Sequence, residues 1–223
     1  MDIPPTATLI PTGDAWLHAD TVIPPRPGGV VVFAHGSGSS RHSPRNRAVA
    51  EVLNRAGMAT VLADLLTVDE ERLDADTREF RFDITLLAER VFGIVDWLRT
   101  TPATSALPVG LFGASTGAAA ALLAAAARPQ TVQAVVSRGG RPDLAGAALS
   151  DVRAPTLLLV GELDEVVLRL NEEAQAAMPG VAELRVVPGA SHLFAEPGAL
   201  EQVAGHAAAW FDTHLRKTDH MLR

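Results

Sequence analysis

Short apolar runs alternate with helix-like segments along most of this 223-residue chain, and that alternation constrains the possible folds most strongly. Strands that alternate with helices form right-handed crossovers, which give a mostly parallel sheet with helices on both faces. The sequence therefore predicts an α/β fold. The runs that predict buried strands are VVVFAH (30–35), ATVLADL (59–65), VGLFGA (109–114), VQAVVS (132–137), TLLLVG (156–161) and LRVVPG (184–189).

Helical patterns fill the intervals between these runs. The segment 44–56 begins with a proline after Ser43, a suitable N-cap, and ends at Gly57. The N-terminal segments TATLIPTGD and WLHADTVIPP predict a hairpin around residues 12–14, which would add antiparallel edge strands. The predicted helices cover residues 44–56, 82–99, 116–127, 165–178 and 200–215.

Composition limits the chemistry and the partners. The chain has no cysteine, which excludes thiolate nucleophiles, disulfides and iron–sulfur clusters. The net charge is −7 and the basic residues are scattered, so we expect no nucleic-acid partner. No apolar run approaches the ~18 residues of a membrane span, and the N-terminus does not resemble a signal peptide, so we expect a cytoplasmic protein with no membrane partner. The length predicts one domain over residues 1–223.

A lone serine stands at the junction of one apolar run and one alanine-rich run, in the sequence GASTG around Ser115. The pattern G-x-S-x-G between a strand and a helix is typical of a nucleophile elbow, in which a strained turn exposes the serine hydroxyl above the sheet. Glycines are needed there because strand and helix pass closely. The sequence therefore predicts Ser115 as a catalytic nucleophile.

A serine nucleophile needs a base, and the base needs an acid that orients it. Reactive groups of open parallel sheets collect beyond the carboxyl ends of strands. Asp164 follows one late strand and His192 follows the next, which favours them as acid and base. The rival acids are Glu162 and Glu165. The other histidines, which we interpret as surface or structural, are His18, His206, His214 and His220.

The oxyanion of an acyl-transfer intermediate needs two N–H donors. We expect one from the backbone of Thr116, directly after the nucleophile. The loop AHGSGSSRHSPRN supplies the other, which we assign to the N–H of Ser37. His35, before this glycine-rich loop, is interpreted as a brace for the loop, and His42 as a surface residue. The loop lacks the patterns of nucleotide-binding loops.

These motifs, HGSGSS, GASTG, GELD and GASHLF, in this order, resemble the α/β-hydrolase fold, and the short chain without a cap domain is similar to its dienelactone hydrolase branch. The resemblance covers residues from about 6 to 216. Dienelactone hydrolases proper use a cysteine nucleophile, whereas this chain has Ser115. The resemblance therefore implies carboxylesterase-type chemistry on a small-molecule ester or lactone with small to medium acyl groups, with no cofactor and no metal.

Several alternatives stay open. The same three residues would serve a thioesterase or transacylase, and the chain could also be a non-catalytic binding protein of this fold. The charged segment 66–81 is either a lid or a solvated excursion. Pairing of two chains into a homodimer through a sheet edge also stays open. Four arginines after strands or in this excursion could bind an anionic substrate or form structural ion pairs: Arg41, Arg81, Arg138 and Arg141.

Overall fold

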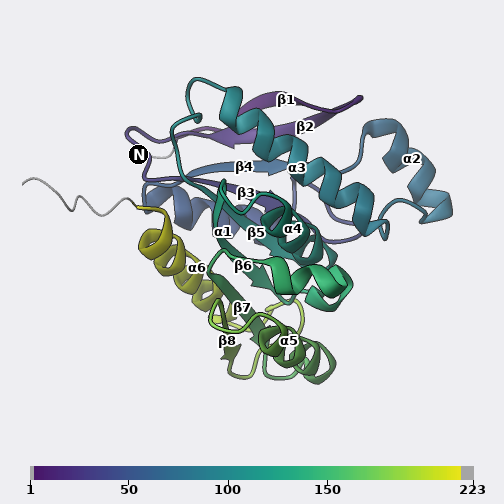
Figure 1. The fold of residues 1–223 in the computed structure, drawn as a ribbon, viewed down its shortest axis with the longest axis vertical. Coiled ribbons are helices and arrows are strands. Elements are labelled where there is room, and N and C mark those ends of the chain that lie inside the picture. Colours follow the sequence, from purple (N-terminus) through teal and green to yellow (C-terminus); the bar gives the residue numbers. More distant parts are fainter. Residues whose placement is uncertain (1–2, 217–223) are drawn as a thin grey trace, which may run out of the picture.

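An eight-stranded sheet runs through the computed structural model, which describes residues 3–216. The strand order is β1-β2-β4-β3-β5-β6-β7-β8 (Figure 1), with β1 and β2 antiparallel at one edge and the other strands parallel. The strands are β1 (Thr6–Thr12), β2 (Ala15–Val22), β3 (Val30–Ala34), β4 (Ala59–Ala63), β5 (Val109–Ala114), β6 (Val132–Arg138), β7 (Thr156–Gly161) and β8 (Ala182–Val187).

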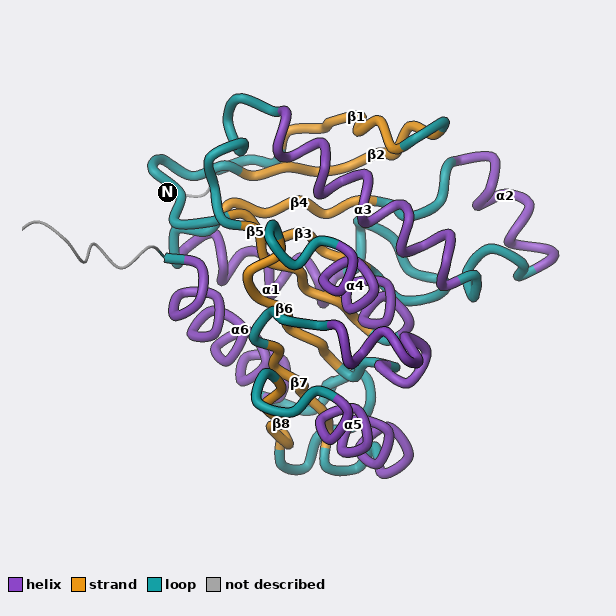
Figure 2. Tube along the Cα trace, viewed as in Figure 1, coloured by secondary structure: helices purple, strands orange, loops and turns teal. Residues whose placement is uncertain are grey.

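Helices cover both faces of the sheet, as Figure 2 shows. One face carries α3, α4 and α5, and the other carries α1 and α6; α2 lies apart from the sheet, beside the N-terminal end of α3 (Figure 1). The helices are α1 (Pro44–Arg55), α2 (Val68–Thr77), α3 (Ile84–Thr100), α4 (Thr116–Ala127), the 3-10 segment η1 (Pro142–Asp151), α5 (Glu165–Ala177) and α6 (Ala199–Leu215).

The central strands are mostly apolar, as expected for strands that are buried on both faces. Every residue of β3, β4, β5 and β7 is buried. Successive side chains point to opposite faces, so Val32 joins the core under α3 and α4, whereas Phe33 joins the core under α1 and α6. There the rings of Phe33 and Phe112 lie with centroids 4.8 Å apart. The sheet thus separates two hydrophobic cores.

The predicted α/β architecture is confirmed, and the predicted parallel strands and helices lie within two residues of their observed ends. Ser43 caps α1 as expected, since its side chain accepts a hydrogen bond from the N–H of Asn46. The charged segment 66–81 contains α2, a helix that is absent from the predicted set. Thr67 and Glu70 form a capping box that starts this helix. The sequence TVDE carried this signal.

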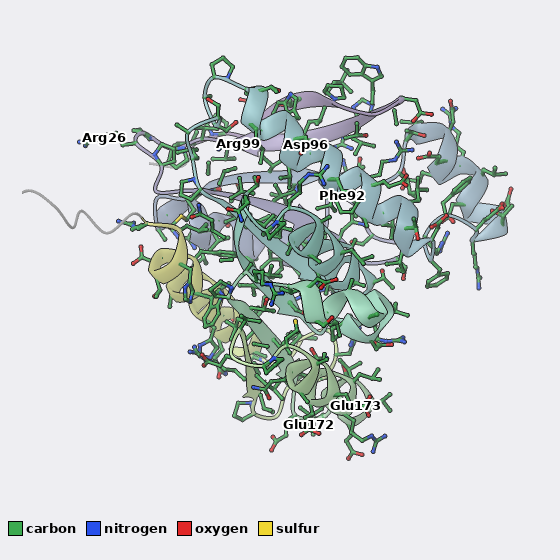
Figure 3. The ribbon with its side chains drawn as sticks, viewed as in Figure 1. Arg26, Phe92, Asp96, Arg99, Glu172 and Glu173 are labelled. Atoms are coloured by element: carbon green, nitrogen blue, oxygen red, sulfur yellow. The ribbon has the colours of Figure 1, made fainter. Side chains whose placement is uncertain are left out.

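The outer surface of the helical layer is charged. Phe92 and Asp96 lie along α3 (Figure 3), where Arg128 pairs with Asp96 at 3.0 Å and lies over the ring of Phe92. Glu172 and Glu173 are exposed on α5 (Figure 3). Among the helices of residues 3–216, none is long and apolar enough to cross a membrane.

Candidate active site

Ser115 lies in the turn between β5 and α4, in a conformation that non-glycine residues rarely adopt. Its φ and ψ are 51° and −124°, which is a strained backbone conformation. Both flanking glycines are required by close backbone contact: a Cβ on Gly113 would lie 2.4 Å from the Cα of Ala118, and one on Gly117 would lie 2.2 Å from the carbonyl oxygen of Ala34. The turn therefore has the geometry that the G-x-S-x-G pattern predicts.

The structure brings Asp164 and His192 together from loops that follow β7 and β8. Nδ1 of His192 lies 2.6 Å from Oδ2 of Asp164, and the aspartate side chain is 15% exposed against 41% for the histidine. Glu162 is engaged elsewhere, because its carboxylate accepts the N–H of Gly189 at 2.7 Å. Glu165 begins α5. A carboxylate beside Nδ1 favours the neutral tautomer with its proton on that nitrogen, which leaves Nε2 as the acceptor.

Ser115 and His192 contact the same short segment of chain. The N–H of Ser115 donates to the carbonyl oxygen of Arg138 at 3.2 Å. A Cβ on the next residue, Gly139, would lie 3.5 Å from Cε1 of His192. Within residues 3–216, however, no hydrogen bond joins the Ser115 hydroxyl to the imidazole. Ser115 and His192 thus both lie beside residues 138–139, but their side chains are not hydrogen-bonded to each other in this conformation.

The loop after β3 lies against the start of α4. The N–H of Ser37 donates to Oγ1 of Thr116 at 2.9 Å. This contact differs from the expectation of a free donor at Ser37, because a threonine hydroxyl occupies it. No local sequence pattern predicts this bond, because Ser37 and Thr116 are far apart along the chain. The N–H of Thr116 is the first of α4, where backbone N–H groups lack partners within the helix.

His35 ties this loop to the end of β4. Its Nε2 accepts the N–H of Leu65 at 3.0 Å, so the neutral ring carries its proton on Nδ1, which donates to the carbonyl oxygen of Gly36 at 2.9 Å. Burial lowers the pKa of His35, which keeps the ring neutral. His35 is therefore a brace of the loop, in agreement with the sequence interpretation.

A cavity of about 220 Å³ lies between this loop and α2. Its lining includes residues 36–39, Asp64, Leu66, Asp74 and Arg81. Asp74 is almost fully buried, and burial alone would raise its pKa. Hydrogen bonds from Arg81 and from the N–H of Phe80 outweigh that effect and lower the pKa. This carboxylate, 2.6 Å from the Arg81 guanidinium, fixes the segment after α2 beside the loop.

Other sequence candidates lie away from Ser115 or are engaged. His206 contacts Arg185 at 3.2 Å, and the ring of His214 packs on Trp210. His18 is exposed on β2, His42 contacts Arg47, and His220 lies outside the described residues. Directly after His192, Leu193 is 48% exposed, whereas Phe194 is buried in the core at 2% exposure.

Comparisons with known proteins agree with this geometry. Residues 17–221 match the Dienelactone hydrolase family. The crystal structure of a dienelactone hydrolase from Anabaena variabilis is 56% identical, has a TM-score of 0.95, and covers 97% of this chain and 100% of its own. A serine hydrolase without a lid from Xanthomonas campestris shares the fold, with 21% identity, a TM-score of 0.76 and 98% coverage of both chains.

Two curated relatives, from Mycobacterium tuberculosis strains CDC 1551 / Oshkosh and ATCC 25618 / H37Rv, are provisionally named phosphoribosyl transferases. Each is 63% identical over 193 residues, which cover 86% of this chain but 43% of the relative. The chain thus spans less than half the length of these relatives. The family match, together with the strained serine turn and the α/β sheet, gives the identification: this chain belongs to the Dienelactone hydrolase family.

Proposed function

We propose that the chain is a serine hydrolase that cleaves carboxylic esters or lactones through an acyl-enzyme. The observation that carries the proposal is the 2.6 Å hydrogen bond between Asp164 and His192, on loops beside the strained turn of Ser115. A neutral serine hydroxyl needs such a base to become a nucleophile at neutral pH. The family supports hydrolysis, and the serine replaces the cysteine that the resemblance would lead one to expect.

In the proposed reaction, His192 takes the hydroxyl proton of Ser115 while Oγ attacks the carbonyl carbon. The proton then passes to the leaving alcohol as the ester bond breaks. A water molecule repeats the sequence on the acyl-enzyme and releases the acid, which restores the serine. Asp164 holds the imidazole in the required tautomer and stabilises its charged form.

The negative charge on the carbonyl oxygen requires donors beside Ser115. The N–H of Thr116 is at the positive end of α4 and is assigned as the first donor. The N–H of Ser37 is assigned as the second. Since that N–H already donates to the Thr116 hydroxyl, the substrate oxygen would share it or replace the hydroxyl as acceptor. The threonine side chain thereby sets the position of the loop before substrate binds.

The test is the hydrolysis of p-nitrophenyl acetate by a Ser115→Ala variant. Loss of the nucleophile from a group that acts as a unit lowers kcat on the order of a millionfold. Ser150→Ala is the matched control, because Ser150 is exposed and its hydroxyl bonds only within its own helical segment. Equal turnover by folded Ser115→Ala and by the control would refute the proposed function.

A further inference from the structure

Arg138 differs from the other arginines that the sequence marked as candidates for binding an anion. Arg41 pairs with Asp64, and Arg141 pairs with Asp143 at 2.7 Å. Arg81 pairs with Asp74. Arg138 has neither an ion pair nor a side-chain hydrogen bond within residues 3–216, although it is only 9% exposed. A buried guanidinium without partners is rare, because its desolvation is uncompensated.

A second guanidinium, that of Arg45, acts on Arg138 electrostatically. Arg45 belongs to the first turn of α1, is half-buried, and has an Nε without a partner in the described chain. Burial, followed by the positive charge of Arg45, lowers the pKa of Arg138 to about 10. Arg138 therefore stays charged at neutral pH, and no carboxylate contributes to that pKa. The first turn of α1 also contains no acidic residue.

The pair belongs to the same edge of the sheet as the candidate active site. Arg138 ends β6, and its carbonyl oxygen accepts the N–H of Ser115. Val136, two residues earlier, packs in the core under α1 and α6. Because strand side chains alternate, the Arg138 side chain projects toward that same face, where α1 begins. Arg138 keeps 9% of its surface exposed and Arg45 is half-buried, so part of each side chain is open to solvent.

Two guanidiniums at a helix N-terminus, without an acid, make a site for a doubly charged anion. A carboxylate supplies one negative charge, whereas a phosphate monoester supplies about 1.5 to 2 at pH 7 and fits the arginine fork. We propose that Arg45 and Arg138 form a subsite that binds a phosphate group carried by the substrate. That this substrate is an ester rests on the proposed function.

Calorimetric titration with inorganic phosphate at constant ionic strength tests the subsite without catalysis. The wild type is expected to bind phosphate, and Arg138→Gln to bind it at least tenfold more weakly. Arg45→Gln is a second variant at a half-buried position, and should weaken binding as well. Arg153→Gln is the charge-matched control, because Arg153 is exposed. Absence of phosphate binding, or equal affinity in all four proteins, would overturn the subsite. Acetate that binds as tightly as phosphate would overturn its preference for a double charge.

A kinetic experiment distinguishes failure of the phosphate subsite from failure of the proposed hydrolase function. The p-nitrophenyl esters of 3-phosphonopropanoic acid and butanoic acid differ mainly in the terminal anion. We expect the wild type to prefer the phosphonate ester in kcat/KM by at least tenfold, and Arg138→Gln to lose that preference. Equal turnover of both esters by the wild type would refute the subsite and leave the hydrolase standing. Failure to cleave either ester would refute the hydrolase, while the titration would still decide the subsite.

Discussion

The helices α2 and α4 are held in place by different interactions. In α2 the local signals are complete: a capping box joins Thr67 and Glu70, acidic residues fill the first turn, and Arg78 closes the helix in the left-handed conformation. Only Asp74 of this helix is buried. In α4 no side chain caps the N-terminus, yet nine of its twelve residues are buried. Local polar contacts therefore define α2, whereas packing against the sheet defines α4.

This difference explains why the strained residue lies where it does. The N-cap residue of α4 is Ser115 itself, so a capping bond would tie its hydroxyl to the helix backbone. Tight packing of alanines against β5 and η1 instead holds the helix, so the positive φ of Ser115 is tolerated. Without a capping bond on α4, the hydroxyl of Ser115 is left uncommitted to the helix, whereas the well-capped α2 lies beside the cavity as a surface element.

The largest effect on stability is expected from a substitution that breaks the packing of α4. Gly117→Ala would place a Cβ 2.2 Å from the carbonyl oxygen of Ala34, so helix and strand must separate. We expect a loss of about 3 kcal/mol in the free energy of unfolding, measured by urea denaturation. Gly205→Ala is the control: no atom lies within 4 Å of its added Cβ, so it should stabilise α6 by roughly 0.5–1 kcal/mol. Equal stability of the two variants would contradict the packing account.

A smaller effect, on activity, is expected from the hydroxyl that joins α4 to the loop after β3. Thr116→Val removes the acceptor of the Ser37 N–H but keeps the size of the side chain. We expect kcat on p-nitrophenyl acetate to fall about ten- to a hundredfold, because one oxyanion donor loses its position. Thr116→Ser keeps the hydroxyl and should retain most of the activity. A valine variant with wild-type kcat would show that the loop does not depend on this bond.

The smallest effect is expected in α2, where one capping side chain is changed. Thr67→Ala removes the acceptor of the Glu70 N–H, which should cost about 1 kcal/mol. Native-state hydrogen exchange should show faster opening of residues 68–77 and unchanged protection in α4. Thr67→Ser should preserve the cap. Equal loss of protection in both helices would mean that α2 and α4 unfold together, which would contradict separate stabilisation by a local cap in α2 and by packing in α4.

Much of this architecture could be predicted because it depends on local patterns. Apolar runs of strand length and the cap at Ser43 each reflect the physics of a few neighbouring residues, and the structure agrees with them. The turn at Ser115 was predictable for the same reason, because Gly113 and Gly117 indicate that β5 and α4 pass close to their neighbours there. The capping box of α2 was also local, but the charged composition of the segment concealed it.

Contacts between distant segments could not be predicted in this way. The bond from Ser37 to Thr116 depends on how a loop folds back over a helix. The electrostatic interaction of Arg45 with Arg138 depends on which face of the sheet α1 covers. Neither interaction can be predicted from the spacing of residues or from the composition of the sequence. Both concern the immediate surroundings of Ser115, so the sequence predicts the candidate nucleophile better than it predicts the groups around it.

Covalent labelling with a fluorophosphonate, followed by peptide mapping, tests the central claim most directly. Attack of an activated serine on phosphorus displaces fluoride and leaves a stable phosphonyl ester. The account predicts one label per chain, on Ser115, and a large loss of labelling in His192→Ala. A protein that stays unlabelled, or that carries the label on another serine, would contradict the assignment of Ser115 as an activated nucleophile.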